Sequence, residues 1–488
     1  MRTALTIPLI ALSLGACSLA PVYERPQAPV AAAWKVGGAG SPHAAADAAP
    51  GAAADAAPAA ASDIGWRDFY AEPALRRLID RALEHNRDLR IAILNIEAAR
   101  AQYGIRRADE LPTVGAGASA SRQRVPADLS PTGRSTISDR YQVDIGVTGF
   151  ELDFFGRVRS LSEAALAEYL ATEEAARAAR IGLVAQVAGG WLAERAAAEQ
   201  MALLERTIEA RQRSYDLIRL RHGAGVASEL ELRQAEGLLE GARAELAVAR
   251  RLRLQARNGL ELLVGAPLAD EDLADGVSLA QARLQAAPPA GLPSALLERR
   301  PDILAAEQRL RGANASIGAA RAAFFPRIAL TGALGTASRE LSGLFGGGSG
   351  IWSFVPQISL PLFDAGRIQS NLDLAEARRN IAVADYERTI QRAFREVADA
   401  LAARSTIGER LRALQAQVDA AARTLELSEL RYRNGVDSQL QWLEAQRSLL
   451  LAEQGLLAAR AAELANRVEL YKALGGGWHE RSASGAAS

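Results

Sequence analysis

Apolar residues recur with two different periods along the chain, and the same order of periods occurs twice. Residues 88–109 and 302–323 show the period of an α-helix. Beyond Pro112 and Pro326 the period becomes two, as in strands with one apolar and one polar face. The clearest apolar positions are Tyr141, Val143, Ile145 and Val147 in the first half, and Trp352, Phe354, Ile358 and Leu360 in the second. Each half is therefore expected to contain a short helix followed by two strands.

Each pair of strands precedes a long helical stretch, a glycine break and a shorter helical stretch. As helices, residues 157–222 would extend about 99 Å and residues 226–264 about 58 Å. Residues 88–109 add about 33 Å, so the two shorter helices nearly match the long one. The second half repeats these lengths, which suit a helical tube. A filamentous coiled coil is the competing interpretation, and it leaves the strands unexplained.

The two halves are copies of one pattern. Three landmarks recur at an offset of 210 residues: Gly156-Arg157 and Gly366-Arg367, Gly225-Val226 and Gly435-Val436, and Val264-Gly265 and Leu474-Gly475. Upstream the offset is 214, as Leu111-Pro112 and Phe325-Pro326 show. Shared turn residues in one register indicate an internal duplication.

The strands have the length that a bilayer requires. Each predicted strand is roughly 10 residues long, which suits a tilted membrane-spanning strand. Four strands cannot close a barrel, and an open sheet edge cannot face lipid because its backbone groups would be unpaired. Three copies would supply twelve strands, enough to enclose an aqueous lumen. The alternative is a soluble antiparallel sheet packed on helices.

The first residues have the features of an export signal. Arg2 precedes the apolar residues 3–16, a run too short to span a bilayer. Leu14-Gly15-Ala16 before Cys17 resembles the bacterial lipobox, which implies a diacylglycerol and an N-acyl chain on Cys17. Ser18 resembles the signal for sorting to the outer membrane. A cleaved signal with an incidental cysteine is the alternative.

Composition excludes several classes of protein. Lys and Arg total 57, as do Asp and Glu, so electrostatic capture of nucleic acid has no support. One cysteine and four scattered histidines exclude disulfide frameworks and offer no metal-ligand spacing. Acidic and basic residues alternate on helical faces as solvated pairs do, so no catalytic site and no cofactor are expected. Arg299-Arg300-Pro301-Asp302 is interpreted as a helix start with solvated charges.

Together these residues resemble the TolC-like outer-membrane channel family of tripartite resistance-nodulation-division efflux systems, in its lipoprotein branch. The runs that carry the resemblance are Cys17–Pro26, Arg299–Ile303, Ile317–Ala320, Phe324–Ile328, Leu430–Ser438 and Leu470–Trp478. The resemblance implies a homotrimer with a twelve-stranded β-barrel in the outer membrane and a periplasmic α-barrel tunnel. It also implies two partners, a periplasmic membrane-fusion adaptor and an inner-membrane exporter.

The implied function is passive conduction of drugs or other small compounds to the exterior. Metal-ion efflux and protein secretion are alternatives, as is a structural coiled-coil envelope lipoprotein. Met1 and Met201 are the only methionines, so soft-metal handling has no visible ligands.

The expected organisation follows from the repeats and their flanks. It comprises a signal peptide (1–16), a lipidated segment (17–36), a low-complexity linker (37–63), an equatorial segment (64–87), repeat 1 (88–265), an inter-repeat equatorial segment (266–298), repeat 2 (299–475) and a C-terminal tail (476–488).

The glycine breaks are the first candidate site. Glycines at these positions end helices and let the chain reverse. The resemblance implies that the same turns form the periplasmic tip that docks on the adaptor. The docking residues would be Gly225, Val226, Ala227, Ser228, Gly435, Val436 and Ser438.

The second candidate site is a periplasmic gate just beyond the second turn. Leu440, Glu444 and Arg447 are spaced by four and three, so they share one helical face. The first copy has Leu230, Gln234 and Gly237 instead, with no charge. The resemblance implies a closed ring here, in which Glu444 stands where an Asp is usual. The alternative is one more exposed ion pair.

Overall fold

The computed structural model describes residues 18–31, 34, 61–131, 133–274, 277–282, 284–285 and 296–482. The predicted signal peptide, Cys17 and residues 37–60 of the predicted linker lie outside the described residues. The linker's last three residues form the short 3-10 helix η2 (Ala61–Asp63). Two compact units result: Met1–Gln27 with Leu94–Glu173 and Ala305–Glu387, and Ala28–Ile93 with Glu174–Leu304 and Arg388–Ser488.

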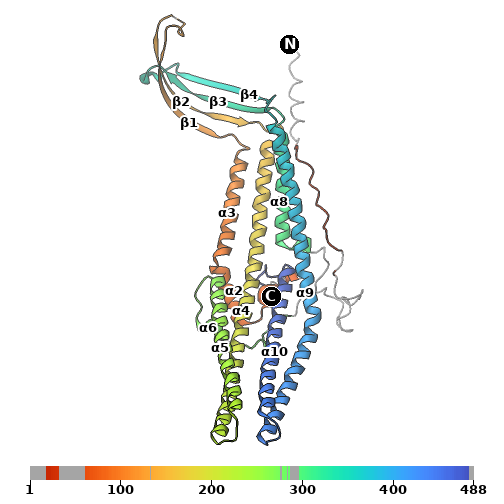
Figure 1. Cartoon of the computed structure of the whole chain (residues 1–488). Helices are drawn as coiled ribbons and strands as arrows, with labels where there is room; N and C mark the ends of the chain where they lie inside the picture. Colours follow the sequence, from red (N-terminus) through yellow and green to blue (C-terminus); the bar gives the residue numbers. More distant parts are fainter. Residues whose placement is uncertain are drawn as a thin grey trace. The chain divides into compact units, whose positions relative to one another are not determined.

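Both halves of the chain contain the same elements in the same order (Figure 1). The first half has α3 (Arg87–Ala108), β1 (Val114–Val125), β2 (Thr136–Glu151), α4 (Arg157–Gly223) and α5 (Glu229–Val264). The second half has α8 (Pro301–Ala322), β3 (Arg327–Ser338), β4 (Gly350–Ser359), α9 (Arg367–Arg433) and α10 (Gln439–Ala473). Helices α3 and α8 each have 22 residues, and α4 and α9 each have 67. The predicted tandem repeat of helices and strands is confirmed.

Shorter helices flank the repeats. They are α1 (Trp66–Phe69), α2 (Pro73–His85), α6 (Asp270–Ala274) and α7 (Leu296–Arg299), whereas the 3-10 helix η4 (Leu341–Gly343) lies between β3 and β4. In the second unit the ring of Phe69 stacks on that of Tyr471, with centroids 3.9 Å apart. The backbone N–H of Trp66 donates to the carbonyl of His479 at 2.9 Å. The segment before repeat 1 and the residues after repeat 2 therefore share one core.

The four strands form one antiparallel sheet in the order β1-β2-β3-β4. Paired residues share a face, so the register shows which side chains lie together. One face carries apolar residues on every strand, among them Val114, Ile145, Leu334, Trp352 and Phe354. These five side chains are 46–81% exposed. The apolar face predicted from the alternation is confirmed, and the opposite face is mostly small or polar.

A helix that crosses a bilayer needs about 20 consecutive, mostly apolar residues. None of the helices in the described parts of the chain is apolar enough over a sufficient length to cross a membrane.

Candidate functional site

The turn after α4 has the hydrogen bonds of a Schellman motif. The backbone N–H of Val226 donates to the carbonyl of Arg221 at 2.8 Å, and that of Gly225 donates to His222 at 2.9 Å. Gly225 has φ 75°, the left-handed conformation that this motif needs at its glycine. Val226 is 64% exposed, so the turn presents an apolar side chain to solvent.

The turn after α9 repeats this geometry. Val436 donates to the carbonyl of Arg431 at 2.9 Å, Gly435 donates to Tyr432 at 3.0 Å, and Gly435 has φ 73°. Val436 is 61% exposed. The carboxylate of Asp437 accepts two hydrogen bonds from the Arg431 guanidinium, which braces this turn further. Figure 1 shows both turns at the same end of the two helical hairpins of the second unit.

The helices that follow the turns begin differently. Ser228 forms a capping box with Glu231, in which its hydroxyl accepts from the Glu231 N–H at 3.2 Å. Because Ser228 is the N-cap, α5 begins at Glu229, three residues later than its periodicity predicted. Ser438 occupies the equivalent position before α10, but its side chain makes no capping hydrogen bond. Ala227 is half-buried beside Ser228.

The predicted gate residues lie on one face of α10, just beyond the second turn. Leu440 is 50% exposed. The Nη2 atom of Arg447 lies 2.6 Å from Oε2 of Glu444, and their side chains are 58% and 46% exposed. Trp442 and Gln446, on the other side of the helix, are buried. The three residues therefore point away from the packing between the hairpins.

Polar side chains join the two hairpins behind this face. The amide nitrogen of Gln439 donates to the carbonyl of Glu231 at 2.8 Å. The amide nitrogen of Gln446 donates to the hydroxyl of Ser214 at 2.8 Å, where both residues are buried. Any rotation of α10 that moves the predicted gate must therefore strain or break these bonds.

The interpretation of Arg300 as a solvated charge is wrong. Its side chain is only 9% exposed and pairs with Asp302 at 2.6 Å and Glu396 at 2.8 Å. It also donates to the carbonyl of Ala473 at 3.0 Å, which ties the start of α8 to α9 and the end of α10. Burial opposes its charge, but the two carboxylates outweigh burial and raise the pKa of Arg300. Arg299 is exposed, as predicted.

The first repeat contains a smaller version of this contact. Asn86, which lies 214 residues before Arg300, donates from its amide to the carbonyl of Leu263 at 2.8 Å. Leu263 itself lies 210 residues before Ala473, so both contacts join equivalent elements. The internal alignment could have located this pair, since it placed Asn86 and Arg300 at matching positions before their helices.

A buried carboxylate holds the N-terminal segment in the first unit. Glu307 on α8 has a side chain that is 2% exposed and pairs with Arg25 at 2.6 Å and Arg311 at 2.8 Å. The hydroxyl of Tyr23 also donates to it, at 3.2 Å. Burial opposes the charge, but hydrogen bonds from Arg25 and Arg311 outweigh burial and lower the pKa of Glu307. Sequence reasoning missed this contact because nearly 300 residues separate its members.

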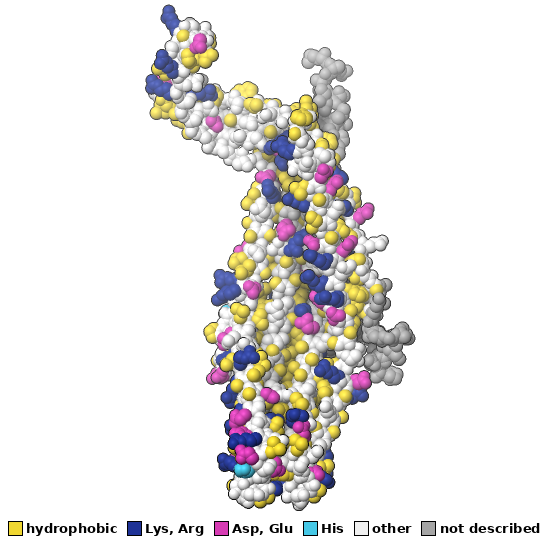
Figure 2. Space-filling view, in the orientation of Figure 1, with side chains coloured by type: hydrophobic (Ala, Val, Ile, Leu, Met, Phe, Trp, Pro, Cys, Tyr) yellow, Lys and Arg dark blue, Asp and Glu magenta, His cyan; other side chains and the backbone are white. Residues whose placement is uncertain are grey.

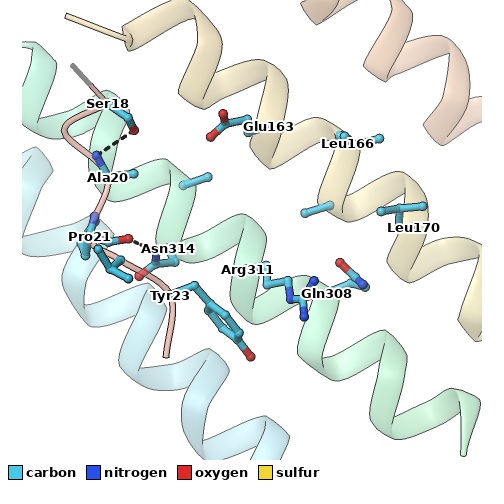
Figure 3. Close-up of a pocket in the computed structure, with 13 residues that line it drawn as sticks. Ser18, Ala20, Pro21, Tyr23, Glu163, Leu166, Leu170, Gln308, Arg311 and Asn314 are labelled. Atoms are coloured by element: carbon cyan, nitrogen blue, oxygen red, sulfur yellow. Dashed lines mark hydrogen bonds between the residues drawn. The ribbon is translucent and has the colours of Figure 1, made fainter. Parts of the chain in front are cut away.

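The same segment borders an open groove of about 650 Å³ between α4 and α8. Figure 3 shows Tyr23 and Pro21 on one side, Leu166 and Leu170 of α4 on another, and Arg311 of α8 between them. The carbonyl of Pro21 accepts a hydrogen bond from the Asn314 amide at 2.7 Å. The residues directly after Cys17 are therefore fixed on α8.

Within the part of the chain that the structure describes, no group of three or more His, Cys, Asp or Glu side chains has the arrangement of a metal site.

Comparisons with known proteins agree with the duplicated architecture. The model of the family described as "Outer membrane efflux protein" matches residues 78–266 and 292–476, and each matched range covers one repeat and the residues just before it. The outer membrane protein OprJ of Pseudomonas aeruginosa is 51% identical over 472 residues, covering 97% of this chain and 95% of OprJ. The antibiotic efflux pump outer membrane protein ArpC of Pseudomonas putida is 48% identical, covering 99% of this chain and 97% of ArpC.

A solved structure shares the fold along nearly the whole chain. It is the open state of the MtrE outer membrane channel of Neisseria gonorrhoeae, 42% identical, with a TM-score of 0.84. The match covers 96% of this chain and all of MtrE. The family model matches both repeats, and these relatives are similar to the chain along nearly its whole length. The chain belongs to the outer membrane efflux protein family, whose members are passive channels rather than enzymes.

Proposed function

We propose that three copies of this chain form the exit duct of a tripartite efflux pump. The observation that carries the proposal is the four-stranded sheet, which has an apolar outer face and unpaired outer edges on β1 and β4 in the described residues. Sheet edges inside a bilayer need hydrogen-bonding partners, and copies of the same sheet would supply them. The long helices after each strand pair would continue the lumen into the periplasm.

Mass and conductance measurements test this assembly. Detergent-solubilised protein should contain three chains, and its channels in a planar bilayer should conduct ions without any turnover. A monodisperse monomer or dimer that conducts would overturn the trimer.

The two helical turns would dock on a periplasmic membrane-fusion adaptor, which would connect the duct to an inner-membrane exporter. Val226 and Val436 support this role because both are exposed and apolar, and both are held by well-bonded turns. In the double variant Val226→Asp with Val436→Asp, site-specific crosslinking should therefore no longer capture the adaptor. Threonine at the same positions keeps the side-chain shape and serves as the control. Equal crosslinking in the Asp variant would exclude the turns as the docking surface.

Leu440, Glu444 and Arg447 would form the periplasmic gate. Threefold symmetry would bring three Glu444 carboxylates near the axis, and Arg447 would relieve their repulsion. Their shared exposure on one face of α10 supports this assignment.

The transported compounds would be organic molecules, including antibiotics. ArpC belongs to an antibiotic efflux pump, and soft metal ions would find no Met or His cluster in the sequence. A strain that lacks its own exit duct should regain antibiotic resistance when it expresses this chain with a matching adaptor and exporter. Resistance to metal salts alone would favour metal-ion efflux.

Lipid on Cys17 would anchor the chain to the outer membrane beside the barrel. The contacts of Pro21 with Asn314 and of Arg25 with Glu307 on α8 support this placement, because they would keep the acylated end close to the strands.

A further inference from the structure

Two arginines interrupt the apolar face of the sheet at the loop end of the first hairpin. Along β1 this face carries Val114 and then three alanines, and its next two positions are Arg122 and Arg124. Their partners on β2 are Asp139 and Ile137, and the pair before them is Ala120 with Tyr141. The face therefore runs from apolar residues through a tyrosine to two cations.

This order matches the border between the apolar and polar layers of a membrane. Arg122 lies eight residues from Val114, about 27 Å along a strand at about 3.4 Å per residue, which spans about 21 Å of height at a strand tilt of about 40°. Outward faces of membrane barrels have an apolar band about 25 Å tall, bordered by aromatic residues. Tyr141 would mark the far border of this band, and the arginines would lie at the level of lipid headgroups.

Both guanidinium groups are accessible. The side chain of Arg122 is 74% exposed, and its Nε lies 3.4 Å from Oδ1 of Asp139. An exposed ion pair of this kind contributes little. Arg124 is exposed and donates from Nε to the hydroxyl of Ser135 at 3.0 Å. Alternate residues on one strand are about 7 Å apart, so the two charges could contact one phosphate or two neighbouring ones.

The surrounding loop leaves the positive charge of this end unchanged. From Arg122 through Arg140 the sequence contains four arginines and two aspartates, so the net charge of +2 equals that of Arg122 and Arg124. Figure 2 shows Lys and Arg side chains gathered at this end of the strands, whereas the adjoining strand surface in view carries few charges. The second hairpin lacks the feature, because Thr336 and Ser338 occupy the matching face of β3.

We propose that Arg122 and Arg124 form a binding site for the phosphate groups of lipopolysaccharide, the phosphorylated glycolipid of the outer leaflet. The inference rests on the proposed function, which places the hairpin loops on the exterior. Arginine suits this ligand because its planar fork donates two hydrogen bonds to phosphate oxygens.

Arg140 provides a matched control. It pairs with Ser121 beside Arg122, so it lies at the same level of the sheet but on the opposite face. Its guanidinium is bonded to Gln142 on that face. Arg122→Gln with Arg124→Gln should reduce the lipopolysaccharide retained by protein purified from outer membranes, measured by native mass spectrometry. Arg140→Gln should retain the wild-type amount, and equal loss in both would overturn the site.

A second arm varies the lipid and uses the wild-type channel, so it does not depend on how the variants fold. Channels in nanodiscs are titrated with lipid A and with lipid A stripped of its phosphates. Each cation near an anionic membrane surface contributes a factor of about 5, so dephosphorylation should weaken binding by about 25-fold. Unchanged affinity would overturn the proposal. Equally tight binding of phosphatidylglycerol would also overturn it, by showing a general anion site.

Conductance of the same preparations distinguishes a failure of the lipopolysaccharide site from a failure of the proposed function. Channels that conduct normally but bind lipid A without regard to its phosphates would remove only the lipopolysaccharide site. Protein that neither fractionates with outer membranes nor conducts would remove the proposed function itself.

Discussion

Single residues far apart in the sequence hold the helical framework together, and Arg300 is the clearest case. Arg300→Gln removes a buried cation and leaves the Glu396 and Asp302 carboxylates without their partner. Loss of one member of a fully buried ion pair costs about 3 kcal/mol or more, and the cost here is smaller because the side chains of Asp302 and Glu396 are 34% and 30% exposed to water. Thermal unfolding in detergent should therefore occur at a clearly lower temperature. Arg299→Gln, one position earlier and exposed, should unfold at the wild-type temperature. An equal decrease in unfolding temperature in both variants would show that the ion pairs of Arg300 do not stabilise the fold.

Glu307 should make attachment of the N-terminal segment sensitive to acid. Its folded pKa lies below the ordinary value of 4.5, so the contact is present at neutral pH and is lost as pH falls through that lowered pKa. A spin label at the exposed position 24 should therefore become mobile as the pH falls through this pKa. Electron paramagnetic resonance measures that mobility. Glu307→Gln should give the mobile spectrum already at pH 7, whereas Glu163→Gln, an exposed carboxylate at the same groove, should not. An immobile label in Glu307→Gln would contradict this.

The sequence revealed the runs that contain such residues but not their roles. Arg300 lies in a recognisable helix start, yet the atoms that bury it belong to residues 396 and 473. Glu307 likewise has the helical spacing of an ordinary solvated carboxylate. Local patterns report which face of a helix a residue occupies, whereas burial of a charge depends on distant partners.

At the scale of elements, periodicity and glycines predicted the long helices to within a few residues. The largest difference in the first repeat is β2, which has 16 residues where roughly 10 were expected. Helix α5 begins three residues late because the Ser228 capping box extends the turn. The shared face of Leu440, Glu444 and Arg447 on α10 was predictable from spacing alone. The bonds from Gln439 and Gln446 to the first hairpin were not, since no single-sequence signal pairs one helix with another.

The predicted gate is tested on α10. Glu444→Gln with Arg447→Ala removes the exposed ion pair and its charges, so single-channel conductance in planar bilayers should rise and cation selectivity should weaken. Gln234→Ala at the matching position of the first repeat should change neither property. Unchanged conductance in the double variant, with trimers intact, would place the constriction elsewhere.

For the whole molecule, membrane attachment should have two independent sources. Cys17→Ala should abolish acylation, while the strands should still insert because their apolar face does not depend on lipid. Labelled fatty acid and membrane fractionation measure the two separately. Fatty acid that still incorporates would refute the lipid site. Loss of all membrane association in an exported, folded variant would count against the strands.

The open edges of β1 and β4 also make the chain prone to aggregation before it assembles. An unpaired edge accepts any extended segment, so each newly exported copy is exposed to aggregation until sister sheets arrive. In the proposed trimer, correct pairing would require an encounter of three chains, whereas incorrect pairing would require only one foreign strand. The yield of channels should therefore depend on how quickly copies meet in the periplasm and on how well that compartment shields their edges meanwhile.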